Sequence, residues 1–93
     1  MPTTTPASPK SDYTQKFEQW KATGPLYKYR KVSGMTMGGC ASALGVSIGT
    51  VQNLEDGNRS PVGKFYFKKL CELLQTGADD VERLWSRWLK RKP

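Results

Sequence analysis

Two neighbouring carboxamide side chains, Gln52 and Asn53, stand in a stretch of the sequence that contains no charged residue. A carboxamide carries both a hydrogen-bond donor and an acceptor, so it can pair with the N6 donor and the N7 acceptor on the edge of an adenine. Ile48 and Thr50 carry methyl groups that suit contact with the methyl group of a thymine, and Gly49 allows the backbone to come close to a base. These five residues are therefore candidates for contacts to base edges.

A short helix must present these side chains together. Ser47 is a favourable N-cap residue for such a helix, and Gly57 is a favourable residue to end it. Val51 and Leu54 are apolar and three residues apart, so a helix points both toward the protein interior. The five candidates then lie on the outer side of the helix, with Thr50 toward one edge.

Another short helix is expected directly before this one, over residues 37–44. Thr36 can accept hydrogen bonds from its first N–H groups, and Gly45 can adopt the left-handed conformation that ends it. Ala41 is small enough to let the two helices approach closely. These features, in this order, are those of a helix-turn-helix.

The segment from Thr36 to Pro61 resembles the lambda-repressor-like helix-turn-helix proteins of the Cro and Xre type. That family has a small residue at the fifth position of the first motif helix, glycine at the ninth, and apolar residues at the fifteenth and eighteenth. The corresponding residues here are Ala41, Gly45, Val51 and Leu54. Residues 55–61 are similar to the family's exit from the recognition helix, and residues 26–36 are similar to its first helix. The resemblance extends over residues 26–74.

The resemblance implies an all-α fold, a lambda-repressor-like bundle of about four core helices, here with an added N-terminal and an added C-terminal helix. It also implies sequence-specific binding to double-stranded DNA, with the second motif helix in the major groove. Members of the family often pair an arginine at the position of Arg30 with a glutamate at the position of Glu55. The resemblance therefore implies an ion pair between the first helix and the end of the recognition helix.

The charge distribution favours a polyanionic partner. The chain has 15 Lys and Arg against 8 Asp and Glu, a formal net charge of +7. Nucleic acid is the first candidate, and the surface of an anionic membrane is the second. No charged residue occurs between positions 32 and 54, so the cations flank the expected motif, and the free N–H groups at the start of its first helix can also attract a phosphate. The candidates for contacts to the DNA backbone are Lys28, Arg30, Lys31, Met37, Gly38, Ser47, Arg59 and Lys64.

The residue pattern disfavours metal binding and catalysis. The sequence has no histidine, and its two cysteines, Cys40 and Cys71, lack metal-ligand spacing. Clustered carboxylates and a phosphate-binding glycine loop are also missing. We therefore expect no enzyme activity, catalytic residue, metal or cofactor. Both cysteines are expected to be core residues in a reducing cytoplasm, and no apolar run has the length of a membrane span.

The chain divides into a tail and one domain. Residues 1–11 are rich in Pro, Thr and Ser and are expected to form a flexible tail, because they contain too little apolar surface to offset the entropy of ordering. Residues 12–93 are expected to form a single DNA-binding domain with outer helices over residues 12–22 and 79–91.

The segment after Pro61 is expected to complete the core. Its apolar pattern predicts a helix that runs to Leu74 and ends at Thr76 and Gly77. The side chains expected to close the core are Val62, Phe65, Tyr66, Phe67, Leu70, Cys71, Leu73 and Leu74.

The C-terminal helix carries a wide apolar stripe, made of Val81, Leu84, Trp85, Trp88 and Leu89. A stripe with two tryptophans must be covered. The cover is either the aromatic stripe of the N-terminal helix, Tyr13, Phe17 and Trp20, or a second copy of the chain. We favour the interpretation that this stripe takes part in a homodimer.

These observations favour a cytoplasmic, sequence-specific regulator of transcription that resembles phage and plasmid repressors and binds double-stranded DNA, as a homodimer. Two alternatives stay open. One is a protein-interaction module, such as an anti-repressor or a polymerase-binding factor, whose C-terminal helix contacts a protein partner. The other is the DNA-recognition subunit of a larger machine, such as a phage packaging enzyme or an antitoxin.

Overall fold

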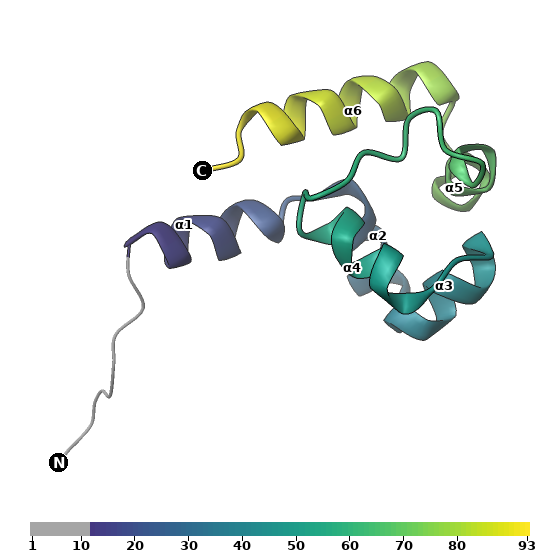
Figure 1. The fold of residues 1–93 in the computed structure, drawn as a ribbon, viewed down its shortest axis with the longest axis horizontal. Helices are drawn as coiled ribbons and strands as arrows, with labels where there is room; N and C mark the ends of the chain where they lie inside the picture. The colour runs from purple at the N-terminus through teal and green to yellow at the C-terminus, as the bar shows by residue number, and fades with distance from the viewer. Residues whose placement is uncertain (1–11) are drawn as a thin grey trace, which may run out of the picture.

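A computed structural model of the chain describes residues 12–93, and the expected tail, residues 1–11, lies outside the described residues. The described part contains six α-helices and no strand, which confirms the expected all-α class (Figure 1). The helices are α1 Asp12–Lys21, α2 Pro25–Ser33, α3 Met37–Leu44, α4 Ile48–Glu55, α5 Phe67–Leu74 and α6 Ala78–Lys90.

The local signals around α3 and α4 act as the sequence predicts. The Thr36 hydroxyl accepts a hydrogen bond from the Gly39 N–H at 3.0 Å, and the Ser47 hydroxyl accepts one from the Thr50 N–H at 3.3 Å. Gly45 ends α3 with a φ of 72°, a left-handed conformation that glycine adopts without steric penalty. These ends fix the short turn that joins the two helices.

The segment after Pro61 differs from its predicted form. Residues 62–66 form turns, in which the Lys64 N–H donates to the Pro61 carbonyl and the Phe67 N–H donates to the Lys64 carbonyl. Gly63 has a φ of 79°, which a right-handed helix cannot accommodate, so α5 begins only at Phe67.

Two further expectations for this segment are wrong. Phe65 is 83% exposed and Val62 is 38% exposed, so neither closes the core. Helix α5 ends at Leu74, as expected, but the residue that stops it is Gln75, which takes the left-handed conformation with a φ of 54°, and not Thr76 or Gly77.

The core lies where α2, α3, α4 and α5 meet, and it continues into buried side chains of α1 and α6. Its fully buried side chains include Leu26, Leu44, Val51, Leu54 and Leu70. The two cysteines are also buried, as expected, and burial raises the pKa of both thiols because a thiolate is poorly solvated there.

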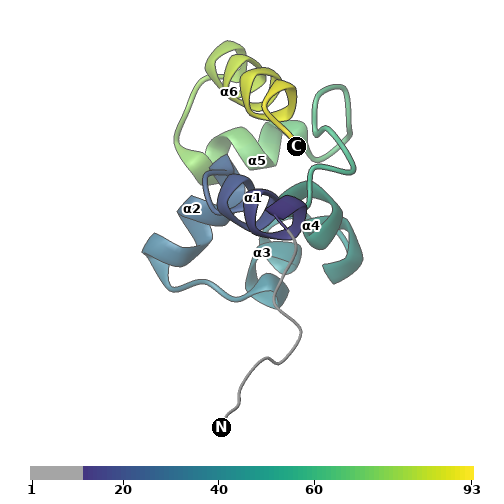
Figure 2. The same cartoon turned by 90° about the vertical axis from the view of Figure 1, so that its left-hand side faces the viewer.

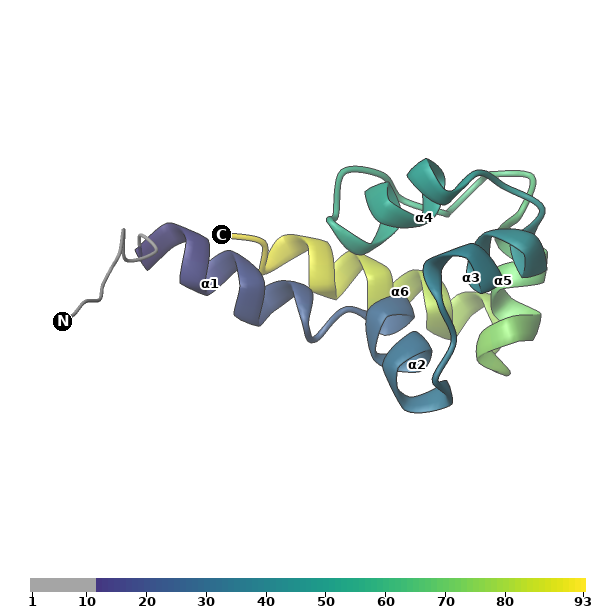
Figure 3. The same ribbon diagram turned by 90° about the horizontal axis from the view of Figure 1, so that it is seen from below.

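Helices α1 and α6 run alongside one another and extend beyond the core (Figure 3). The indoles of Trp20 and Trp88 stack with ring centres 4.1 Å apart and planes 5° from parallel. Each indole N–H donates to the other residue's backbone carbonyl, at 2.6 Å from Trp20 and 3.0 Å from Trp88. The tryptophans therefore hold the two outer helices together.

This packing shows that the chain itself covers most of the stripe of α6, which is the first of the two covers expected from the sequence. Val81, Trp85 and Trp88 are buried within the chain. Leu84 is 43% exposed, so it lies outside the covered stripe, and on α1 Tyr13 is 59% exposed. Leu89 packs against the core while partly exposed.

Within residues 12–93, no helix is both long enough and apolar enough to cross a membrane.

Candidate nucleic-acid interface

Helix α4 presents one face to the core and the other to the outside. Val51 and Leu54 are fully buried, whereas Ile48 is 54% exposed and Gly49 and Gln52 are exposed. Residues four apart are neighbours on a helix surface, so Ile48 lies beside Gln52, and Gly49 lies beside Asn53. These four predicted candidates form one outer stripe, in which Asn53 is half-buried.

Thr50, the fifth base-contact candidate, lies at the edge of this stripe. Its hydroxyl is 3.2 Å from the hydroxyl of Ser47, the residue that caps α4. Thr50 is half-buried and Ser47 is exposed. The pair is therefore placed at the start of α4, where a phosphate or a base edge can be reached.

The start of α3 adjoins the outer stripe of α4. A Cβ atom placed on Gly38 would lie 3.8 Å from Cδ1 of Ile48, so the first turn of α3 and the first residue of α4 are neighbours. The first N–H groups of a helix have no partner within the helix and attract anions. Gly38, one of the predicted backbone contacts, is thus brought beside the predicted base contact Ile48, and Met37, another of them, precedes it at the start of α3.

The ion pair that the resemblance implies is present. The guanidinium of Arg30 donates from Nε to Oε2 of Glu55 at 2.6 Å and from Nη2 to Oε1 at 3.1 Å. Both residues are buried. These hydrogen bonds, with the attraction of the carboxylate, raise the pKa of Arg30 above its ordinary value. Two nitrogens of the Arg30 guanidinium are thus engaged by Glu55, and the residue also lines the hollow that includes Lys31 and Met37.

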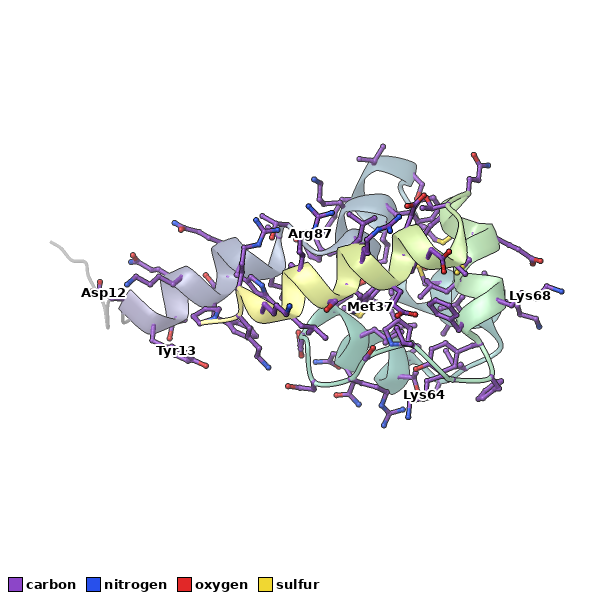
Figure 4. All side chains as sticks on the ribbon, turned by 90° about the horizontal axis from the view of Figure 1, so that it is seen from above. Asp12, Tyr13, Met37, Lys64, Lys68 and Arg87 are labelled. Carbon is purple, nitrogen blue, oxygen red and sulfur yellow. The ribbon has the colours of Figure 1, made fainter. Side chains whose placement is uncertain are left out.

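The remaining cationic candidates are divided between two sides of the molecule. Arg59 and Lys64 are exposed on the loop between α4 and α5, which runs on the same side as α4 (Figures 3 and 4). Helix α2 lies on the opposite side (Figure 3). Its Lys31 lines a hollow with Met37 at the start of α3, but Lys28 lines another hollow with Leu84 of α6. Lys28 therefore lies apart from the other candidates for contacts to the DNA backbone.

Two lysines that were not among the candidates lie close to this surface. The ammonium group of Lys69, on α5, would be 3.8 Å from a Cβ atom placed on Gly45, in the turn between α3 and α4. Lys92, beyond α6, donates at 3.3 Å to both the Gly57 carbonyl and the side-chain oxygen of Asn58. Neither contact has a signal in sequence spacing, because each joins segments more than 20 residues apart.

The surface around α4 is thus suited to recognition of a polyanion with hydrogen-bonding edges. Among the described residues, no group of three or more His, Cys, Asp or Glu side chains is arranged to hold a metal ion. In Figure 2, α2 lies on the left and α4 on the right of the molecule, with α3 between them. No protein-family model matches the chain, and neither the curated proteins nor the solved structures show a significant similarity to it.

Proposed function

We propose that the protein is a sequence-specific, double-stranded DNA-binding regulator of transcription that places α4 in the major groove. One observation carries this proposal. An uncharged outer stripe on α4, which ends in two carboxamides, lies between the N-terminus of α3 and the exposed cations of the loop that follows α4. The α3 and α4 pair, with its resemblance to the Cro and Xre type of helix-turn-helix, supports the same function.

The contacts have two distinct roles in this mechanism. Phosphate contacts from Arg59, Lys64 and the start of α3 set the position of the protein on the duplex and carry no sequence information. Gln52 and Asn53 then read base edges, each pair of hydrogen bonds to an adenine favouring the correct base by about 1–3 kcal/mol. Because the reading stripe has no Arg or Lys, the preferred site is rich in A·T pairs.

Regulation follows from occupancy of the site. A protein bound over a promoter excludes polymerase or redirects it. As a further part of the proposal, two copies bind an inverted repeat whose half-sites lie about 34 Å apart, one turn of B-DNA. The tryptophans of α6 already pack within the chain, so this pairing uses another surface.

The test is selection of duplexes from a random pool by the full chain, followed by titration of the best duplex and of a scrambled one. Wild type should bind the selected duplex at least about 1,000-fold more tightly than the scrambled one. A Gln52→Ala, Asn53→Ala variant should lose this preference and keep salt-dependent binding to any duplex.

A matched control removes two amides elsewhere. Gln15 and Gln19 are exposed on α1, so a Gln15→Ala, Gln19→Ala variant should bind like wild type. If selection enriches no sequence, or if the α4 variant keeps the full preference, the proposal is wrong. The ratio of protein to duplex at saturation tests the pairing of two copies.

The structure weakens the support for a protein-interaction module. That alternative relied on the aromatic stripes of the outer helices as an exposed interface. Trp20, Trp85 and Trp88 are buried within the chain, so Tyr13 and Leu84 are the exposed members of the two stripes.

A further inference from the structure

The loop between α4 and α5 has a defined shape. The Val62 N–H donates to the Ser60 hydroxyl at 3.3 Å, and the Lys64 N–H donates to the Pro61 carbonyl at 3.1 Å. Pro61 itself is buried. The tip of the loop is therefore anchored at its base by hydrogen bonds and by packing.

This loop exposes apolar side chains that the core does not use. Phe65 is 83% exposed, and Val62, in the turn directly before it, is 38% exposed. The ring of Phe65 meets the ring of Tyr66 edge to face, with centres 5.3 Å apart. Because Tyr66 is buried, it supports the Phe65 ring and holds it outward.

The surroundings of these apolar side chains are positively charged. From Glu55 to Lys69 the chain has two acidic residues, and both are paired, Glu55 with Arg30 at 2.6 Å and Asp56 with Lys21 at 2.8 Å. The cations of the same segment are exposed and, within the described residues, have no carboxylate partner. They are Arg59, Lys64, Lys68 and Lys69.

An apolar ring among unpaired cations suits a partner that is both anionic and rich in flat apolar faces. A DNA strand offers phosphates beside deoxyribose and base faces, and apolar side chains are known to insert between base steps. A second copy of this loop would instead bring like charges together, which opposes association. Charge complementarity therefore selects nucleic acid as the occupant.

We propose that Phe65 and Val62 form an apolar contact to DNA nucleotides that flank the bases under α4, with Arg59 and Lys64 on the neighbouring phosphates. This inference rests on the proposed function and extends it. It adds the loop as a second element of recognition, on the same side of the molecule as α4 (Figure 4).

The test places a tryptophan at position 65 and, as a matched control, at position 32. Val32 is an equally exposed apolar residue, 89% exposed on α2, which lies on the other side of the molecule (Figure 3). The three native tryptophans are buried, so a Phe65→Trp or Val32→Trp variant has one tryptophan that acrylamide can quench freely. Quenching is measured with and without the selected duplex, while anisotropy of labelled DNA reports binding on the same samples.

The new tryptophan at 65 should become protected from acrylamide when DNA binds, whereas that at 32 should stay accessible. A Phe65→Ala variant should also bind the selected duplex about 5- to 150-fold more weakly, the range for loss of one aromatic contact to a base. A Val32→Ala variant should bind like wild type.

Three other results would overturn the inference. If DNA binds and the tryptophan at 65 stays accessible, the loop does not contact DNA and the proposed function still stands. If that tryptophan is protected before DNA is added, in a concentration-dependent way, the loop contacts a second copy of the chain. If anisotropy shows no binding to any duplex, the proposed function fails together with the inference.

Discussion

Arg30 and Glu55 connect α2 to the end of α4 through two hydrogen bonds between buried charged groups. A buried ion pair adds little to folding stability when compared with apolar residues of the same size. The loss of one partner is costly, however, because it leaves a buried charge without an opposite charge beside it. At the scale of single residues, this pair is the most sensitive point of the candidate interface, because it holds the helix that carries Gln52 and Asn53.

A Glu55→Ala variant should therefore lower the free energy of unfolding by about 3–5 kcal/mol. Urea denaturation followed by circular dichroism measures the change. The control is Asp56→Ala, because the pair of Asp56 with Lys21 is partly exposed and such pairs contribute about 1 kcal/mol or less. If both variants lost the same free energy of unfolding, the buried pair would stabilise the fold no more than the partly exposed one.

At the scale of elements, α1 supports the end of α4. Gly57 follows α4 with a φ of 74°, and a Cβ atom placed on it would overlap the ring of Trp20. Lys92 donates to the Gly57 carbonyl, and its ammonium group lies 5.8 Å from the centre of the Trp20 indole. Trp20 of α1 and Lys92, which follows α6, therefore hold the point where the chain leaves α4.

The overlap gives a quantitative expectation for Gly57→Ala. The left-handed conformation of a non-glycine residue costs about 1–2 kcal/mol, and the collision with Trp20 adds about 1–3 kcal/mol of overpacking. Gly63→Ala is the matched control, because Gly63 has a φ of 79° and nothing lies within 4 Å of the added Cβ atom. Thermal unfolding of both variants separates the cost of the left-handed conformation from the cost of the collision with Trp20. A loss that is no larger at 57 than at 63 would contradict the close packing of α1 on this glycine.

At the scale of the whole molecule, the net charge of +7 does not say which cations meet a polyanion. Lys64 lies on the side of α4, whereas Arg87 lies on α6 and points to the other side (Figure 4). The proposed function assigns phosphate contacts to the first side only.

This assignment predicts different salt dependences for two variants of equal charge. Each phosphate contact contributes about 0.9 to the slope of log K against log salt concentration. Lys64→Ala should therefore reduce this slope by about 1, and Arg87→Ala should leave it unchanged. Titration of one duplex at several salt concentrations measures both. Equal changes would mean that binding depends on the overall charge and not on the face of α4.

The sequence by itself determined the helices and most of their ends. Thr36, Ser47 and Gly45 act within one turn of their own positions, and the spacing of Val51 and Leu54 needs only the helical period to define an inner face. The pair of Arg30 and Glu55 spans 25 residues and was predictable only from the resemblance.

Only the tertiary structure decided which surface covers each apolar side chain. The stripe of α6 has the same period whether Trp20 or a second copy covers it, and the pattern after Pro61 does not distinguish a buried Phe65 from an exposed one. Hydrophobic burial is not directional, so a sequence pattern shows that a side chain has an apolar character but not its partner. The partner depends on contacts between distant segments, such as Trp20 with Trp88, which form only when the whole chain has folded.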